Sequence, residues 1–175
     1  MECERCEGAF LRTEAPQKQQ GQWLLAASGA IPALVAAYMF LRFNKYGISV
    51  FEMSPVPGVL GGPIAGNIRI PKPIEIEQGV DLTLQCVHQY TTRSGKSSTT
   101  HRNILWNDTR RVETVYNDGA GMVLPVRFTI PSDQPATDAA GNNDGHYWQL
   151  KVKAKTAGID YAAVFDVPVT GTAQS

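Results

Sequence analysis

The stretch DLTLQCVHQYTT, from Asp81 to Thr92, decides the fold class of the chain. Its side chains alternate between two directions, which is typical of a β-strand, and one face carries Leu82, Leu84, Cys86, His88 and Tyr90. A turn signal follows at residues 93–96, and residues 99–115 supply a second long strand. We therefore predict a long, protruding β-hairpin.

Short alternating runs bounded by Gly, Pro, Asn and Asp recur on both sides of this hairpin, and no stretch after Ser49 has a helical period. Further strands are expected at residues 66–70, 74–77, 122–130, 146–155 and 159–169. About seven strands joined mostly by short turns predict an antiparallel, immunoglobulin-like β-sandwich.

Composition limits the classes of partner. The chain has 175 residues, enough for one core, and its 16 basic and 16 acidic side chains give a net charge of zero. Nucleic-acid binding through bulk charge needs a basic excess, so we expect no nucleic-acid partner.

An uncharged run separates Lys18 from Arg42. A helix of this length spans roughly 30 Å, the thickness of a bilayer core, and Trp23 and Tyr38 near its ends suit the interfaces. A cleaved signal peptide and a buried core helix are the alternatives. The acidic segment before the run and its length favour a transmembrane helix at residues 22–43.

The chain is therefore divided into five parts. We expect a flexible tail (1–21), the transmembrane helix (22–43), a linker with a first extended segment (44–62), the sandwich domain (63–170) and a C-terminal tail (171–175). Because Arg42 and Lys45 lie directly after the apolar run, the positive-inside rule favours a cytoplasmic C-terminal domain.

Three segments carry a resemblance to a known family: residues 124–138 (LPVRFTIPSDQPATD), 146–154 (HYWQLKVKA) and 160–169 (DYAAVFDVPV). They resemble the N-terminal half of arrestin-like sandwiches. Together with the segments around Phe51, Pro57–Gly62 and Ile104–Trp106, they resemble an uncharacterised family of bacterial membrane-anchored proteins. The resemblance implies an arrestin-like β-sandwich and a bacterial inner-membrane location, and it brings no catalytic residues.

Motifs for cofactors and metals are incomplete. Residues 94–98 (SGKSS) end like a phosphate-binding loop, but Tyr90 stands where its first glycine is needed. Asp138, Asn142 and Asp144 suggest a calcium loop, yet its first and twelfth ligands would be Ala140 and Lys151. We expect no cofactor and no metal.

Cysteine spacing also points away from a metal. Cys3 and Cys6 form one Cys-x-x-Cys pair without a second pair to complete a zinc site, so we expect two reduced thiols. Cys86 has the position of a small buried core residue.

Positive charge gathers on the predicted hairpin. A contact with anionic lipid or an acidic protein surface is expected to use Arg93, Lys96, Arg102, Arg110 and Arg111. The alternative is that these side chains solvate a sheet face.

These observations favour a membrane-tethered, non-catalytic protein-interaction or scaffold module with a protein partner. The alternative is an accessory subunit or hydrolase-like enzyme that uses His88 and His146, both expected on inward faces. An enzyme needs a pocket where titratable groups converge, whereas a binding module needs an exposed edge or patch.

Overall fold

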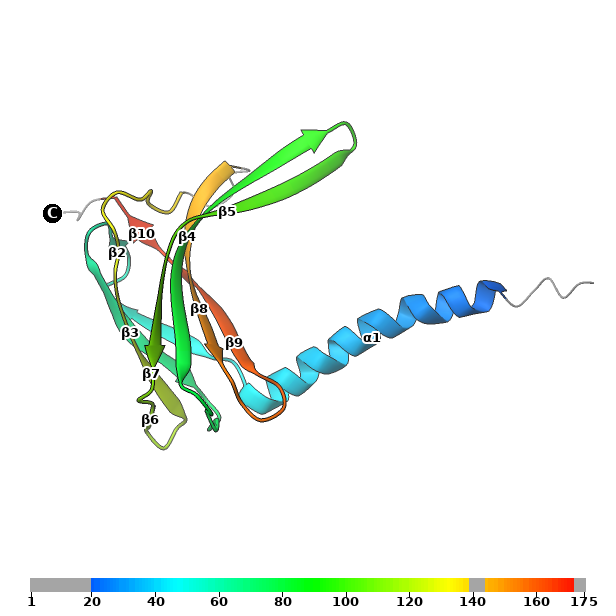
Figure 1. Ribbon diagram of the computed structural model, residues 1–175, viewed down its shortest axis with the longest axis horizontal. Coiled ribbons are helices and arrows are strands. Elements are labelled where there is room, and N and C mark those ends of the chain that lie inside the picture. The colour runs from blue at the N-terminus through cyan, green and yellow to red at the C-terminus, as the bar shows by residue number, and fades with distance from the viewer. Residues whose placement is uncertain (1–19, 139–143, 172–175) are drawn as a thin grey trace, which may run out of the picture. The chain divides into compact units, whose positions relative to one another are not determined.

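The computed structural model describes residues 20–138 and 144–171, with side chains from residue 31 onward (Figure 1). The chain divides into two compact units, residues 1–41 and 42–175. Helix α1, Gln20–Tyr46, covers the described end of the first unit and continues into the second. Among the described residues, no helix combines the length and apolar character that a bilayer crossing requires, so the predicted transmembrane helix at 22–43 is not supported.

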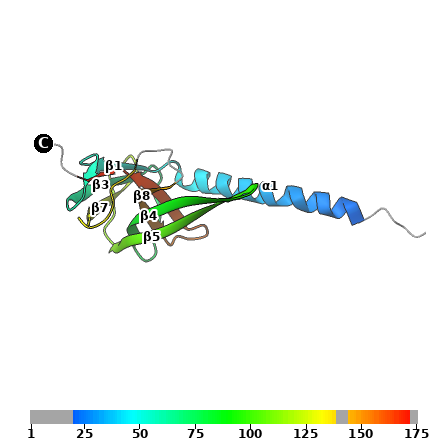
Figure 2. The same ribbon diagram turned by 90° about the horizontal axis from the view of Figure 1, so that it is seen from above.

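The second unit is built from ten strands in its described part. They are β1 (Val50–Ser54), β2 (Gly58–Val59), β3 (Pro63–Ile70), β4 (Val80–Ser94), β5 (Ser97–Val112), β6 (Tyr116–Asn117), β7 (Met122–Thr129), β8 (Asp144–Ala154), β9 (Tyr161–Val167) and β10 (Val169–Thr170). The first sheet has the order β1-β3-β7-β6 and the second sheet the order β5-β4-β8-β9, each with antiparallel neighbours (Figure 1, Figure 2).

Alternation along the strands produces the core between these two sheets. On β3 every buried side chain has an even number, and β4 follows the same rule from Val80 to Leu84. The largest fully buried side chains include Trp148 and Phe128, each 1% exposed. Burying one face of each sheet is the main source of sandwich stability. The predicted antiparallel β-sandwich is confirmed, with seven strands of five or more residues in the described part.

The segment between the helix and β3 belongs to the sandwich. Residues 44–62, predicted as a linker with a first extended segment, contain β1, which pairs with β3, and β2, which pairs with β10. The β2–β10 pair is parallel, unlike the wholly antiparallel pairing expected from the sequence. Residues 74–77, which alternate in sequence, form no strand.

The end of α1 that lies in the second unit is tied to the β8–β9 connection. Tyr46 is only 2% exposed. Its hydroxyl lies 2.7 Å from Thr156 Oγ1 and donates to the carbonyl of Ile159. Its ring packs edge-on against Tyr161, with 5.2 Å between ring centroids. Lys45 Nζ donates to the Ile159 carbonyl at 2.9 Å. Buried tyrosines normally find such partners, and these bonds fix the entry of the chain into the sandwich.

β4 and β5 are much longer than the other strands. At 15 and 16 residues, each extends over roughly 50 Å, about twice the span of β3 or β7. A bulge interrupts their pairing between Cys86 and Val87, because Trp106 and Ile104 pair with consecutive residues and leave Leu105 unpaired. Bulges bend and twist a strand. Beyond this point the predicted hairpin leaves the body of the sandwich (Figure 1).

Candidate functional site

The protruding part of the β4–β5 hairpin has little support from the other strands. β8 pairs with β4 only between Val80 and Tyr90, so the pairs from Thr91–Thr100 to Ser94–Ser97 form a two-stranded ribbon. Within the described chain, no strand pairs with the other edge of β5. Every side chain from Ser97 to Leu105 is exposed, including Ile104 at 56% and Leu105 at 45%.

Local contacts keep this ribbon in register. Ser94 pairs with Ser97, so Gly95 and Lys96 form a two-residue turn, and Gly95 has a φ of 59°, which glycine adopts without strain. Thr92 Oγ1 lies 3.1 Å from His101 Nε2. The SGKSS segment is therefore the tip of a hairpin and does not open a helix, as a phosphate-binding loop would.

The predicted contact residues for an anionic surface fall into two groups. Near the body, Arg111 donates twice to Asp81, at 2.7 and 3.1 Å, and Arg110 donates to Asp108 at 3.1 Å. The Arg111 guanidinium lowers the pKa of Asp81 through these bonds. Both arginines therefore already have a carboxylate partner.

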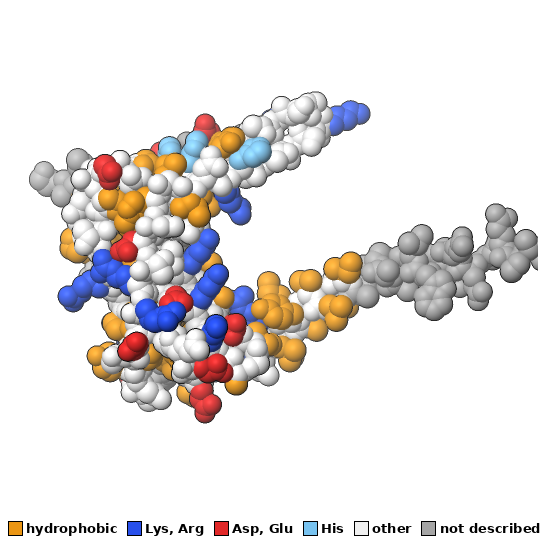
Figure 3. Space-filling model, viewed as in Figure 1, with side chains coloured by type: hydrophobic (Ala, Val, Ile, Leu, Met, Phe, Trp, Pro, Cys, Tyr) orange, Lys and Arg blue, Asp and Glu red, His pale blue; other side chains and the backbone are white. Residues whose placement is uncertain are grey.

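Further out, the cations have no acidic partner. Residues 82–107 contain no Asp or Glu. Arg102 Nε donates to the neutral Gln89 at 2.9 Å, and no ion pair joins Arg93 or Lys96 to any described residue. Figure 3 shows histidines along the hairpin and a cation at its tip. The outer hairpin is thus a positively charged, carboxylate-free element of a neutral protein.

Four rings continue the inner face of the second sheet onto the hairpin. His146, His88, Tyr90 and His101 follow one another with centroid distances of 4.6, 5.4 and 5.0 Å. The first two lie opposite each other on β8 and β4, and the last two on β4 and β5. We name this set the ring ladder. It stiffens the place where the hairpin leaves the body.

Carboxylates hold the base of the ring ladder. His88 Nε2 lies 2.5 Å from Asp144 Oδ1, and His146 Nδ1 lies 2.9 Å from Asp138 Oδ2. The same Asp138 oxygen also accepts the backbone N–H of His146 at 2.7 Å. This backbone bond, followed by the bond to the imidazole, lowers the pKa of Asp138. The two aspartates flank residues 139–143, which are outside the described part.

The structure brings His88 and His146 together, as the enzyme alternative requires, but in a stacked arrangement. Their rings are inclined by only 18°. Because imidazole lone pairs lie in the ring plane, stacked rings do not converge on one ion. Among the described residues, no group of three His, Cys, Asp or Glu side chains is placed to hold a metal. The described polar contacts of the two imidazole rings are with carboxylates, His88 with Asp144 and His146 with Asp138.

The remaining predicted positions lie elsewhere. Cys86 is fully buried, and burial raises the pKa of its thiol to about 11. Cys3 and Cys6 lie outside the described residues, as do the middle positions of the predicted calcium loop.

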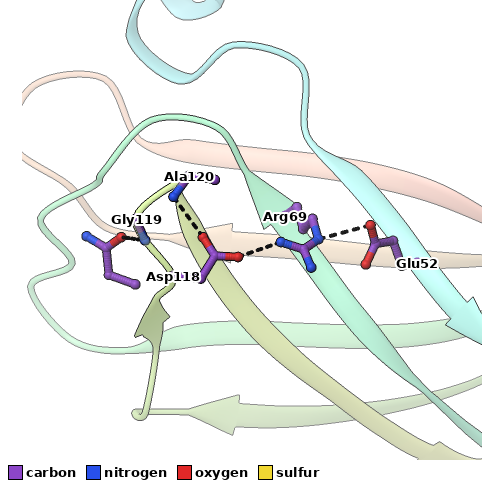
Figure 4. Close-up of polar contacts among 6 residues, drawn as sticks. Glu52, Arg69, Asp118, Gly119 and Ala120 are labelled. Atoms are coloured by element: carbon purple, nitrogen blue, oxygen red, sulfur yellow. Dashed lines mark hydrogen bonds and ion pairs between the residues drawn. The ribbon is translucent and has the colours of Figure 1, made fainter.

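A charged cluster on the outer face of the first sheet was not predicted from the sequence. Arg69 on β3 donates to Glu52 on β1 at 2.9 Å and to Asp118 at 2.5 Å (Figure 4). Asp118 also accepts the Ala120 N–H at 3.0 Å, and this bond, with that from Arg69, lowers its pKa. Glu52 and Asp118 are 17 and 49 positions from Arg69 in sequence. The β1–β3 pairing and the β6–β7 turn bring them together, so no local signal could have shown the cluster.

A small cavity of about 250 Å³ lies beside this cluster. Its other walls are mostly apolar and include Ile48, Val50, Pro71 and Met122. Cavities that hold cofactors or drug-sized ligands usually measure about 300–1,000 Å³, so this cavity is smaller than a usual ligand site. None of the three histidines lines it.

Comparisons with known proteins add little to this picture. No protein-family model and no curated protein matches the chain. The solved structures that match include the sporulation control protein Spo0M from Bacillus subtilis, with 14% identity and a TM-score of 0.46 over 69% of this chain; the chain spans about half of Spo0M, at 48%. CsgH from R. palustris matches with 12% identity and a TM-score of 0.20, over 67% of this chain and 89% of CsgH. An engineered protein matches with 14% identity and a TM-score of 0.32, over 71% of this chain and 20% of its own. The β-sandwich therefore rests on the strand pairing described above.

Proposed function

We propose that the sandwich is a non-catalytic protein-binding module and that the outer β4–β5 hairpin is its binding element. One observation carries this proposal: Ser97–Leu105 is exposed without interruption along an edge that no described strand occupies. Exposed, extended edges are recognised in protein complexes by main-chain pairing. A strand of this length, kept outside the core, is otherwise an aggregation hazard.

The enzyme alternative has weaker support. An active site brings titratable groups into a recess where a substrate is desolvated. His88 and His146 stack on each other at the base of the hairpin. The described cavity lies on the other sheet, beside Arg69. We therefore assign the histidines a positioning role at the hairpin base.

The predicted membrane attachment, the cytoplasmic side of the domain and the arrestin-like class of sandwich stay predictions from the sequence. The proposed binding role needs none of them.

Site-specific photo-crosslinking in the producing cells tests the proposal. A photoreactive amino acid replaces Thr99 on the hairpin or, as a matched control, Thr129, an exposed threonine on β7. We expect one defined protein adduct from position 99 and none from position 129. Equal labelling at both positions, or no adduct at position 99, would overturn the proposal.

A further inference from the structure

The free edge of β5 presents a row of main-chain N–H and C=O groups over the exposed run Ser97–Leu105. We infer that this edge accepts an extended, acidic segment of another protein as an added strand. The inference rests on the proposed function and specifies the chemistry of the partner. An added strand would satisfy the free main-chain groups and extend the second sheet beyond β5.

Charge complementarity identifies the partner as acidic. Residues 82–107 carry Arg93, Lys96 and Arg102 and no carboxylate side chain. Asp81 and Asp108, the acids just outside this stretch, are already bonded to Arg111 and Arg110. An acidic side chain on an added strand would therefore meet unneutralised cations.

The register defines the pattern of the added strand. Arg102 pairs with Gln89, and Ile104 pairs with Val87, so Arg102 and Ile104 lie on the same, outer face of the sheet. A guest strand can therefore place an acidic side chain near Arg102 and a β-branched side chain two positions away near Ile104. Such cross-strand pairs are the stabilising unit of a sheet.

A second copy of this chain is a poorer occupant. Pairing two β5 edges would bring two carboxylate-free, cationic hairpins together, and like charges placed opposite each other destabilise a sheet. An anionic lipid surface is also less suitable. Of the five arginine and lysine side chains expected to contact it, Arg110 and Arg111 are already ion-paired. Lipid cannot use the main-chain edge.

Titration calorimetry and amide hydrogen exchange of the full chain test the inference with a synthetic peptide of about ten residues. The probe repeats Glu-Thr-Val-Thr, and the matched control peptide repeats Lys-Thr-Val-Thr. We expect the acidic peptide to bind and the lysine peptide not to bind. Binding of the acidic peptide should weaken at high salt. Exchange of about every second amide of Ser97–Asn107 should slow on binding, because only alternate N–H groups point to the open edge.

Two variants distinguish binding at the β5 edge from nonspecific electrostatic binding. Arg102→Glu should weaken binding of the acidic peptide about tenfold, because it replaces attraction by repulsion. The control Arg127→Glu, an exposed arginine on β7, should leave binding unchanged. Binding without alternate amide protection, or equal binding of the lysine peptide, would overturn the inference.

Two further outcomes would replace the proposed occupant. Protection of the same amides on self-association without peptide would identify a second copy. Preferential flotation with phosphatidylserine vesicles, abolished by Arg102→Glu, would identify lipid. A hairpin-specific adduct at position 99 without peptide binding would leave the proposed function intact and remove strand addition.

Discussion

Two tryptophans show where the sandwich body ends and the binding hairpin begins. Trp148 on β8 and Trp106 on β5 share the inner face of one sheet, with 5.6 Å between ring centroids. Trp148 is 1% exposed, whereas Trp106 is only partly buried and every residue from Ser97 to Leu105 is exposed. One sheet thus serves as core wall at one end and as free surface at the other. Stability should therefore depend on the body, and binding on the hairpin.

The largest expected effect is the loss of a body side chain. Trp148→Ala should lower the free energy of unfolding by about 3–5 kcal/mol, because it empties the core and removes the bond from its indole N–H to the Pro135 carbonyl. Urea unfolding measures this. The matched hairpin change, Ile104→Ala, should cost less than about 0.5 kcal/mol. Similar losses for both variants would contradict the comparison.

The second effect concerns the tie between α1 and the sandwich. Tyr46→Phe leaves the ring in place and removes the hydroxyl that serves Thr156 and Ile159. We expect a loss of about 0.5–1.5 kcal/mol in unfolding free energy, the net contribution of a hydrogen bond, because Lys45 and Thr156 still donate to the Ile159 carbonyl. Tyr116→Phe, at a tyrosine that is 59% exposed, is the control and should be neutral. Equal midpoints for the two variants would show that the tie contributes nothing.

Lowering the pH should reduce the stability of the fold through exposed carboxylates that are hydrogen-bonded in the folded state. Asp81, Asp118 and Asp138 have lowered pKa values in the folded state, so they bind protons more readily when unfolded. Their stabilisation is present at neutral pH and is lost as the pH falls below the ordinary carboxyl range. Urea midpoints should fall modestly between neutral pH and about pH 3. Asp138→Asn should show a shallower decline, and an identical slope would refute its role.

The smallest effect is expected at the hairpin cations. Arg102→Gln should change the unfolding free energy by less than about 0.5 kcal/mol, because an exposed side chain bonded to a neutral amide contributes little. A loss above about 1 kcal/mol would mean that the hairpin belongs to the cooperative core, and the distinction between the two regions would fail.

The sandwich and the hairpin could be predicted because alternation and turn residues are local signals. The cross-strand partners could not. Counting back from the Ser94–Ser97 pair, a regular hairpin places Arg110 opposite Asp81. The bulge instead brings Arg111 there, and Arg110 is left to Asp108. The Arg69 cluster depends likewise on the β1–β3 pairing, and the short strand β1 directly precedes a Pro- and Gly-rich segment that begins at Pro55.

The bulge residue Leu105 sets the direction of the outer β4–β5 hairpin without affecting which side chains the hairpin presents. Because every pair between Val87–Ile104 and Ser94–Ser97 is in regular register, removal of Leu105 would leave each of these partners unchanged. It would remove the local bend and extra twist that a bulge introduces. Insertions or deletions of one residue at this site would therefore steer the hairpin to partners in other orientations while its sequence stays the same.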